Sequence, residues 1–175
     1  MELEELQVHV CSALRVLHEH DDYLLTHGLH ERSIAHKLAN YLQLCFPELN
    51  VDCEYNGNCE SENGRKVIYS LDNELNTIRS GAQQSNGSLP EDVEALRVYP
   101  DIIIHRRGQN AQNLLVIEIK KSSNRRHQNF DKKKLSAFTR SDCEFEFQFG
   151  LFLEIGTLEA VGRDRMIWYQ NGSVL

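Results

Sequence analysis

Two apolar runs, Tyr99-Pro-Asp-Ile-Ile-Ile-His105 and Asn113-Leu-Leu-Val-Ile-Glu-Ile-Lys120, decide the fold of this chain. Both runs are rich in β-branched residues and lack polar alternation, which is typical of strands covered on both faces. Residues 106–112 lie between the runs and are polar or basic apart from one glycine and one alanine. We therefore expect the runs to form an antiparallel hairpin inside a buried sheet.

The register of this hairpin brings two carboxylates together. If the hairpin closes around residues 109 and 110, Asp101 lies directly opposite Glu118, with their Cβ atoms about 4.5–5.5 Å apart. Because side chains two residues apart share a face of a strand, Lys120 lies beside Glu118. His105 shares the face of Asp101, where a structural role is favoured. Carboxylates this close repel each other unless a proton or a divalent cation lies between them, and Mg²⁺ accepts one or two carboxylates.

Helical periodicity precedes the hairpin. Apolar residues recur every three or four positions over residues 3–23, with an interruption at the polar run 18–22, and again over residues 30–45, where Pro47 ends the pattern. Glu31 lies three residues before Ile34, on the apolar stripe of the second helix. A carboxylate on that stripe is unusual. Glu31 is therefore either at a frayed helix start or directed at a buried group that favours a charge.

The remaining patterns predict one α/β domain over residues 1–175. Residues 56–98 are irregular and predict a partly mobile insertion, with a short strand near residues 66–69 and a short helix opened by Pro90. The other expected elements are a strand at 51–55, a basic helix at 129–140 with Leu135 and Phe138 inward, strands at 145–155 and 165–169, and a turn at Asn171-Gly172. Together they indicate a mixed central β-sheet flanked by helices on both faces.

Composition excludes several classes of protein. The 175 residues are 41% hydrophobic and 26% charged, which suits one globular domain. No apolar stretch approaches the length of a membrane span, and the acidic amphipathic N-terminus does not resemble a secretory signal. Five cysteines without a framework spacing favour free thiols in the cytoplasm, and Cys53 and Cys59 lack the second pair that structural zinc requires.

The charge distribution is uneven. The net charge of −7 is unusual for a protein that holds a phosphate backbone. However, residues 120–140 contain eight lysines and arginines and a single acid, Asp131. This asymmetry permits a basic face on an acidic protein. A solvated helix face over residues 132–134 explains the same run of charges equally well.

The order of these residues resembles the PD-(D/E)XK nuclease superfamily, to which many restriction endonucleases and junction resolvases belong. The resemblance rests on Tyr99-Pro-Asp101 and on Glu118-Ile-Lys120 at the end of the next apolar strand, and it spans residues 31–155. Stretches 53–56, 100–108, 113–121 and 131–135 also look like a small uncharacterised bacterial branch. The resemblance implies a restriction endonuclease-like fold and a Mg²⁺- or Mn²⁺-dependent endonuclease that acts on nucleic acid, DNA rather than RNA.

The resemblance also implies a role for each site residue. Lys120 would orient or activate the attacking water, and Lys134 would reach the scissile or a neighbouring phosphate. A metal ion would be held by Asp101, Glu118, Glu31 and the backbone carbonyl of Ile119. Double-strand cleavage would favour a homodimer, and the small size of the chain also suits a subunit that is targeted by a partner.

Structural interpretations of the same residues remain open. Asp101 is also an ordinary strand-start cap, Glu118 with Lys120 an ordinary charge pair, and Glu31 an acid favoured by the helix dipole. The cluster at residues 18–22 contains two histidines, but His-x-His on a helix directs its rings apart. The alternative function is a catalytically inactive module of the same fold that binds nucleic acid or a protein partner, which the acidic net charge favours.

Overall fold

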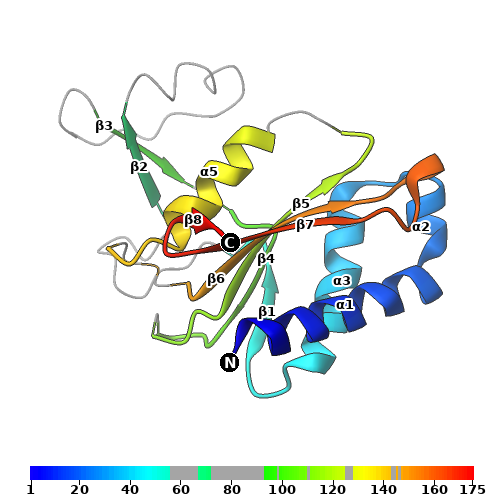
Figure 1. Cartoon of the computed structure of the whole chain (residues 1–175), viewed down its shortest axis with the longest axis horizontal. Helices are drawn as coiled ribbons and strands as arrows, with labels where there is room; N and C mark the ends of the chain where they lie inside the picture. The colour runs from blue at the N-terminus through cyan, green and yellow to red at the C-terminus, as the bar shows by residue number, and fades with distance from the viewer. Residues whose placement is uncertain are drawn as a thin grey trace.

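The computed structural model describes residues 1–55, 67–71, 93–97, 99–109, 111–124, 128–142, 145 and 147–175. Over these residues the chain forms a mixed α/β fold around a six-stranded sheet (Figure 1). The strands lie in the order β1-β4-β5-β6-β7-β8, with β5 and β6 parallel and the other described neighbours antiparallel. Their bounds are Asn50–Cys53 (β1), Ile102–His105 (β4), Leu115–Lys121 (β5), Phe149–Ile155 (β6), Arg165–Gln170 (β7) and Ser173–Val174 (β8).

The β4–β5 hairpin has the predicted register. Ile102 pairs with Ile117, and Ile104 pairs with Leu115. All four residues of β4 and the first five of β5 are buried, as their uniform apolar sequence predicts. In this register the next opposed positions are Asp101 and Glu118. Asp101 itself lies in a bend immediately before β4, so it stands at the entrance of the strand.

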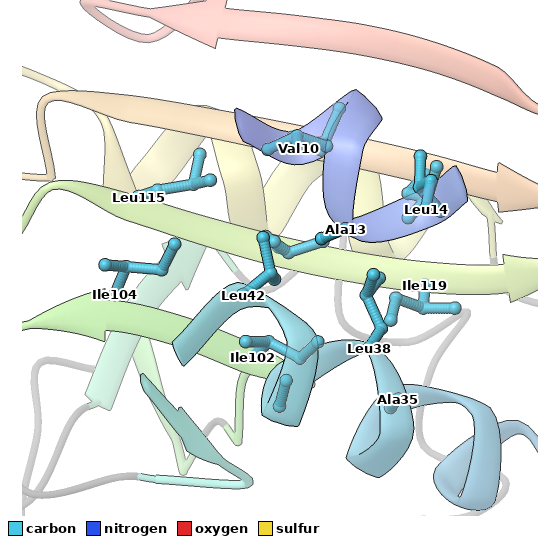
Figure 2. Close-up of a cluster of buried hydrophobic side chains, with 14 of the residues drawn as sticks. Val10, Ala13, Leu14, Ala35, Leu38, Leu42, Ile102, Ile104, Leu115 and Ile119 are labelled. Carbon is cyan, nitrogen blue, oxygen red and sulfur yellow. The ribbon is translucent and has the colours of Figure 1, made fainter. Parts of the chain in front are cut away.

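One face of the sheet is covered by α1 (Leu3–His20) and α3 (Glu31–Cys45). Figure 2 shows their side chains directed at the alternate residues of β4 and β5 that share this face. These contacts include Leu14, Leu38, Leu42, Ile104 and Ile119, all of them buried. Burying a leucine or isoleucine side chain stabilises the fold by about 1.5–3 kcal/mol. The helical periodicity of residues 3–20 and 31–45 is thus explained by this layer.

The first helix is shorter than its periodicity predicts. α1 ends at His20, and a separate short helix, α2 (Asp22–Thr26), follows after Asp21. The Asp21 carboxylate accepts a hydrogen bond from the Tyr41 hydroxyl and lies 3.2 Å from Lys37 Nζ, both on α3. These contacts anchor the turn at Asp21, where the polar run at residues 18–22 also interrupts the apolar spacing.

The other face of the sheet is covered by α5 (Gln128–Phe138). Leu135 and Phe138 are fully buried against Ile103 and Val116, as predicted. The strand expected from residue 145 begins only at Phe149. Phe145 and Phe147 are nevertheless buried, because their rings pack edge-on against Phe138 with centroids 5.1 and 5.9 Å from its own.

A second, two-stranded antiparallel sheet lies within the expected insertion. It consists of β2 (Val67–Leu71) and β3 (Val93–Arg97). The strand expected near residues 66–69 is confirmed. The helix expected after Pro90 is wrong for residues 93–97, because pairing with β2 makes them a strand. Pro90 and the rest of residues 56–98, for which an irregular and partly mobile segment was predicted, lie outside the described residues.

The C-terminal hairpin and the remaining connection agree with local chemistry. Asn171 (φ 50°) and Gly172 (φ 78°) form the turn between β7 and β8, as the Asn-Gly pair predicts. A short 3₁₀ helix, η1 (Leu158–Ala160), lies between β6 and β7. In the described part of the chain, no helix has the length and apolar character needed to cross a membrane.

Candidate functional site

Asp101 is joined to β5 by a hydrogen bond to the backbone. Its Oδ2 accepts from the N–H of Ile119 at 2.7 Å. Its carbonyl oxygen accepts from the N–H of Glu54 at 3.3 Å, so the bend is also held from the β1 side. Burial raises the pKa of the Asp101 carboxyl, against the lowering effects of the Ile119 bond and of nearby Lys134 and Lys120. Asp101 is thus a carboxylate kept in place beside Glu118 with incomplete compensation of its charge.

Glu118 is the most deeply buried acid of the site, with 1% of its surface exposed. It points to the α5 face, where its Oε2 lies 2.7 Å from Lys134 Nζ. Its Oε1 accepts no hydrogen bond within the described part of the chain. Burial raises the pKa of Glu118 well above its usual range; Lys134 opposes that shift, and the charges of Asp101 and Asp131 add to it. A buried acceptor without a donor is costly unless something else satisfies it.

Lys120 lies between two acids from opposite layers. Its Nζ is 3.2 Å from Glu31 Oε1 on α3 and 3.1 Å from Asp131 Oδ2 on α5. Burial disfavours its charge, but Asp131 and Glu31 outweigh burial and raise the pKa of Lys120 above its ordinary value. The ammonium group is therefore held in its charged form at the end of β5.

Asp131 is the site residue that the sequence interpretation missed. It is 4% exposed, and its Oδ1 lies 3.2 Å from Lys134 Nζ while its Oδ2 contacts Lys120. The sequence presents it as the single acid in a basic run and as part of the stretch 131–135, with no role at the site. A signal was nevertheless present, because residues 131, 134, 135 and 138 have the spacing of one helix face. A stripe that contains Leu135 and Phe138 buries Asp131 and Lys134 as well.

Glu31 begins α3 and is directed at the end of β5. Its Oε2 accepts from the backbone N–H of Lys121 at 3.0 Å and from the Asn124 amide at 3.5 Å, while its Oε1 contacts Lys120. Glu31 is the first residue of α3, and its carboxylate is directed at a half-buried charge, that of Lys120, which favours the second alternative. Lys121 turns away from the cluster, since its Nζ donates to the carbonyls of Gly28 and Leu29.

The charges of the cluster do not balance. Four carboxylates, those of Glu31, Asp101, Glu118 and Asp131, surround the two ammonium groups of Lys120 and Lys134. With every group ionised, the formal charge of the cluster is −2, which one divalent cation would neutralise. No set of three or more His, Cys, Asp or Glu side chains is arranged as a metal cage among the described residues. Mg²⁺ does not need one, because it binds through one or two carboxylates and keeps several waters. The unpartnered Oε1 of Glu118 fits such an ion, and a proton on Glu118, whose pKa burial raises, is the other means of reducing the negative charge.

A polar cavity of about 620 Å³ adjoins this end of β5. Ser122 and Ser123 follow β5 directly, and Thr157 contacts both hydroxyls at 3.4 and 3.1 Å. The other lining residues include Gln128, Glu154 and Arg165. A further cavity, of about 690 Å³, lies around Asn113 and Phe147 at the opposite end of β5. The candidate site residues themselves line neither cavity, and the first one adjoins them only through Ser122 and Ser123.

Other residues considered from the sequence lie elsewhere. His105 is 2% exposed, and its Nε2 is 2.9 Å from Asp52 on β1 with the Tyr55 ring beside it, so it contributes to the packing of the sheet edge. His18 pairs with Asp164 at 2.8 Å. Cys53 is an exposed free thiol, and Cys59 lies outside the described residues.

The structure therefore brings Asp101, Glu118, Lys120, Glu31 and Lys134 into one cluster and adds Asp131 to them. This cluster lies where the hairpin meets α3 on one side and α5 on the other. No family model matches the chain, and neither the curated proteins nor the solved structures include a significant match to it.

Proposed function

We propose that this protein is a Mg²⁺- or Mn²⁺-dependent nuclease of the PD-(D/E)XK type, with a restriction endonuclease-like fold, and that it hydrolyses phosphodiester bonds in DNA. The observation that carries the proposal is the placement of Asp101 opposite Glu118, with Lys120 on the same face. With every group ionised, the surrounding cluster has a formal charge of −2, which favours the binding of a divalent ion.

Asp101 and Glu118 would hold the ion, together with the backbone carbonyl of Ile119. A bound divalent ion lowers the pKa of its water and stabilises the attacking and leaving oxygens of a phosphodiester. Lys120, kept charged by two acids, would orient the attacking water and offset the negative charge that develops on the phosphate. Glu31 fixes the end of β5 through Lys121 and holds Lys120 from the α3 side.

A nucleic acid substrate is supported by the surroundings of the site. The basic segment 120–140 begins in β5 and continues through α5. The cavity beyond Lys120 offers hydroxyl and amide donors of the kind that contact phosphate oxygens. DNA is the proposed polymer. A cytoplasmic location is proposed with it, in keeping with the free thiols of Cys11, Cys45 and Cys53.

Cleavage by the purified protein tests this function. Supercoiled plasmid, linear duplex, single-stranded DNA and RNA would be incubated with Mg²⁺ or Mn²⁺, beside Glu118→Gln and Lys120→Met. Wild type should cut at least one DNA substrate, and both variants should lose at least about 100-fold in rate. Glu48→Gln removes one exposed acid outside the cluster and should cut normally. Equal inactivity of wild type and variants on all four substrates would contradict the proposal.

A non-catalytic module is the second candidate. It is favoured by one observation, namely that Lys120 and Lys134 each contact two carboxylates and so form a connected network of ion pairs. Such a network also serves as a structural element. Calorimetric titration with Mn²⁺ distinguishes the two, because a module without a metal site shows no binding that Glu118→Gln abolishes. A homodimer or a complex with a partner subunit is compatible with either function.

A further inference from the structure

Lys134 would compete with a metal ion for the carboxylate of Glu118. It projects from α5 toward the sheet, its side chain is 10% exposed, and its Nζ lies 2.7 Å from Glu118 Oε2. A divalent ion bound to Glu118 and this ammonium group repel each other at such short range. An ion on Oε1 of Glu118 therefore weakens the attraction between Oε2 and Lys134, and an ion that binds both oxygens displaces the ammonium group.

Asp131 gives the withdrawn ammonium group another partner. It lies three residues before Lys134 on the same helix, and its Oδ1 is already 3.2 Å from Lys134 Nζ. A lysine ammonium is a point charge on a flexible four-carbon stem, so it moves between neighbouring carboxylates through rotations of its own side chain. The second oxygen of Asp131 contacts Lys120, so Asp131 bridges the two lysines of the site.

We propose that Lys134 is an internal cation that neutralises Glu118 before a divalent ion enters, and that Asp131 is the positioning residue that retains Lys134 once the ion displaces it. This inference rests on the proposed function and deepens it. The ion exchanges with a tethered ammonium group, and the released ammonium stays beside the site, charged and available to a phosphate. No bond is made or broken in this exchange.

Binding of Mn²⁺ alone, without nucleic acid, tests the exchange by calorimetry. Lys134→Met removes the competitor, so Mn²⁺ should bind at least about tenfold more tightly than to wild type. Lys134→Arg keeps the charge and introduces a guanidinium group, which binds a carboxylate through two hydrogen bonds. Mn²⁺ should therefore bind more weakly than to wild type. Lys133→Met removes an equal charge from an exposed position of the same helix and should change the affinity little.

Asp131→Asn should weaken Mn²⁺ binding by about 10- to 100-fold, because Lys134 then has only Glu118 to pair with. The double variant with Lys134→Met separates this effect from a simple loss of negative charge. If Asp131 acts by retaining Lys134, Asp131→Asn should cost little affinity when Lys134 is already methionine. If it acts only through its charge, the loss of affinity should be the same in both backgrounds, and the role of Asp131 is refuted.

The outcomes distinguish this inference from the proposed function. Mn²⁺ binding that depends on Glu118 but is unchanged or weakened by Lys134→Met refutes the exchange and leaves the nuclease intact. An absence of Mn²⁺ binding in every variant refutes both. Should Lys134→Met not fold, because Glu118 is then buried without a cation, the Lys134→Arg arm decides: tighter or unchanged Mn²⁺ binding refutes the exchange.

Discussion

The Oδ2 oxygen of Asp101 lies 2.7 Å from the backbone nitrogen of Ile119, between the two charged residues Glu118 and Lys120. The Ile119 side chain points the other way, into the core formed with α1 and α3. The backbone of β5 thus fixes Asp101, and the core fixes the backbone. The buried strand β5 therefore holds the carboxylate of Asp101, which itself lies in the bend before β4.

Asp101→Asn should reduce the cleavage rate without reducing the stability of the fold. Asparagine retains an acceptor oxygen for the Ile119 N–H but cannot carry a negative charge. Because burial raises the pKa of the Asp101 carboxyl, its ionised form is held at a cost, so the free energy of unfolding without metal should stay unchanged or rise by about 1 kcal/mol. Cleavage should fall at least about 100-fold. Urea denaturation and plasmid cleavage measure the two effects.

Asp101→Ala is the matched control for that substitution. It also removes the acceptor, which leaves the buried Ile119 N–H unsatisfied and should destabilise the protein by about 1–3 kcal/mol relative to Asp101→Asn. Equal stability of the two variants would show that the hydrogen bond contributes nothing to the bend.

The fold of the hairpin was predictable because its signals are local. Uniform β-branched runs predict buried strands, and the period of two residues then fixes which side chains share a face, so the opposition of Asp101 and Glu118 follows from the register alone. Asp131 was missed for the opposite reason. Its role depends on which face of α5 packs on the sheet. The run of lysines suggests a solvated face, whereas the spacing of Leu135 and Phe138 indicates that Asp131 lies on the buried face.

Tertiary contacts decide two local features. The sequence predicts helical residues over 3–23 with an interruption at 18–22, and the contacts of Asp21 with Tyr41 and Lys37 on α3 make that interruption the end of α1. Pro90 favours a helix start, but residues 93–97 pair with β2. In both places the partner is distant in sequence, so no pattern read along the chain reveals it.

Glu31→Gln should show whether Glu31 binds the metal or supports Lys120. The structure joins its carboxylate to Lys120 and to the N–H of Lys121, so we expect a supporting role. Glutamine keeps an acceptor for that N–H but loses the ion pair. The cleavage rate should fall about tenfold or more, whereas Mn²⁺ affinity measured by calorimetry should change less than about threefold. A loss of Mn²⁺ affinity as large as that of Glu118→Gln would make Glu31 a ligand.

Asp52→Asn should reveal a pH-dependent contribution to stability from the edge of the sheet. Burial disfavours the Asp52 carboxylate, but hydrogen bonds from Arg107 and His105 outweigh burial and lower its pKa below the usual 3.8. A lowered pKa means that the stabilisation is complete above the unfolded-state pKa and is lost as pH falls through the folded-state pKa. The free energy of unfolding of wild type should exceed that of the variant by about 1–2 kcal/mol at pH 7. This difference should decrease below pH 3.8.

Urea titrations at several pH values measure that difference. Glu19→Gln, which breaks the exposed pair with Arg15 on α1, is the control and should show no resolvable change. A difference between wild type and Asp52→Asn that stays constant from neutral to acid pH would contradict the assignment.

Arg165 should contribute to nucleic acid binding without contributing to the chemistry. It is exposed and lines the polar cavity next to Ser122 and Ser123, beyond the ion pairs of the site. Anisotropy titrations of labelled DNA, with Glu118→Gln as background to prevent cleavage, measure its role. Arg165→Gln should weaken binding uniformly across sequences and reduce the salt slope by about one, as the loss of one phosphate contact requires. Arg15→Gln removes an equal charge from α1 and should leave the slope unchanged. Identical slopes for the two variants would mean that DNA does not pass over this cavity.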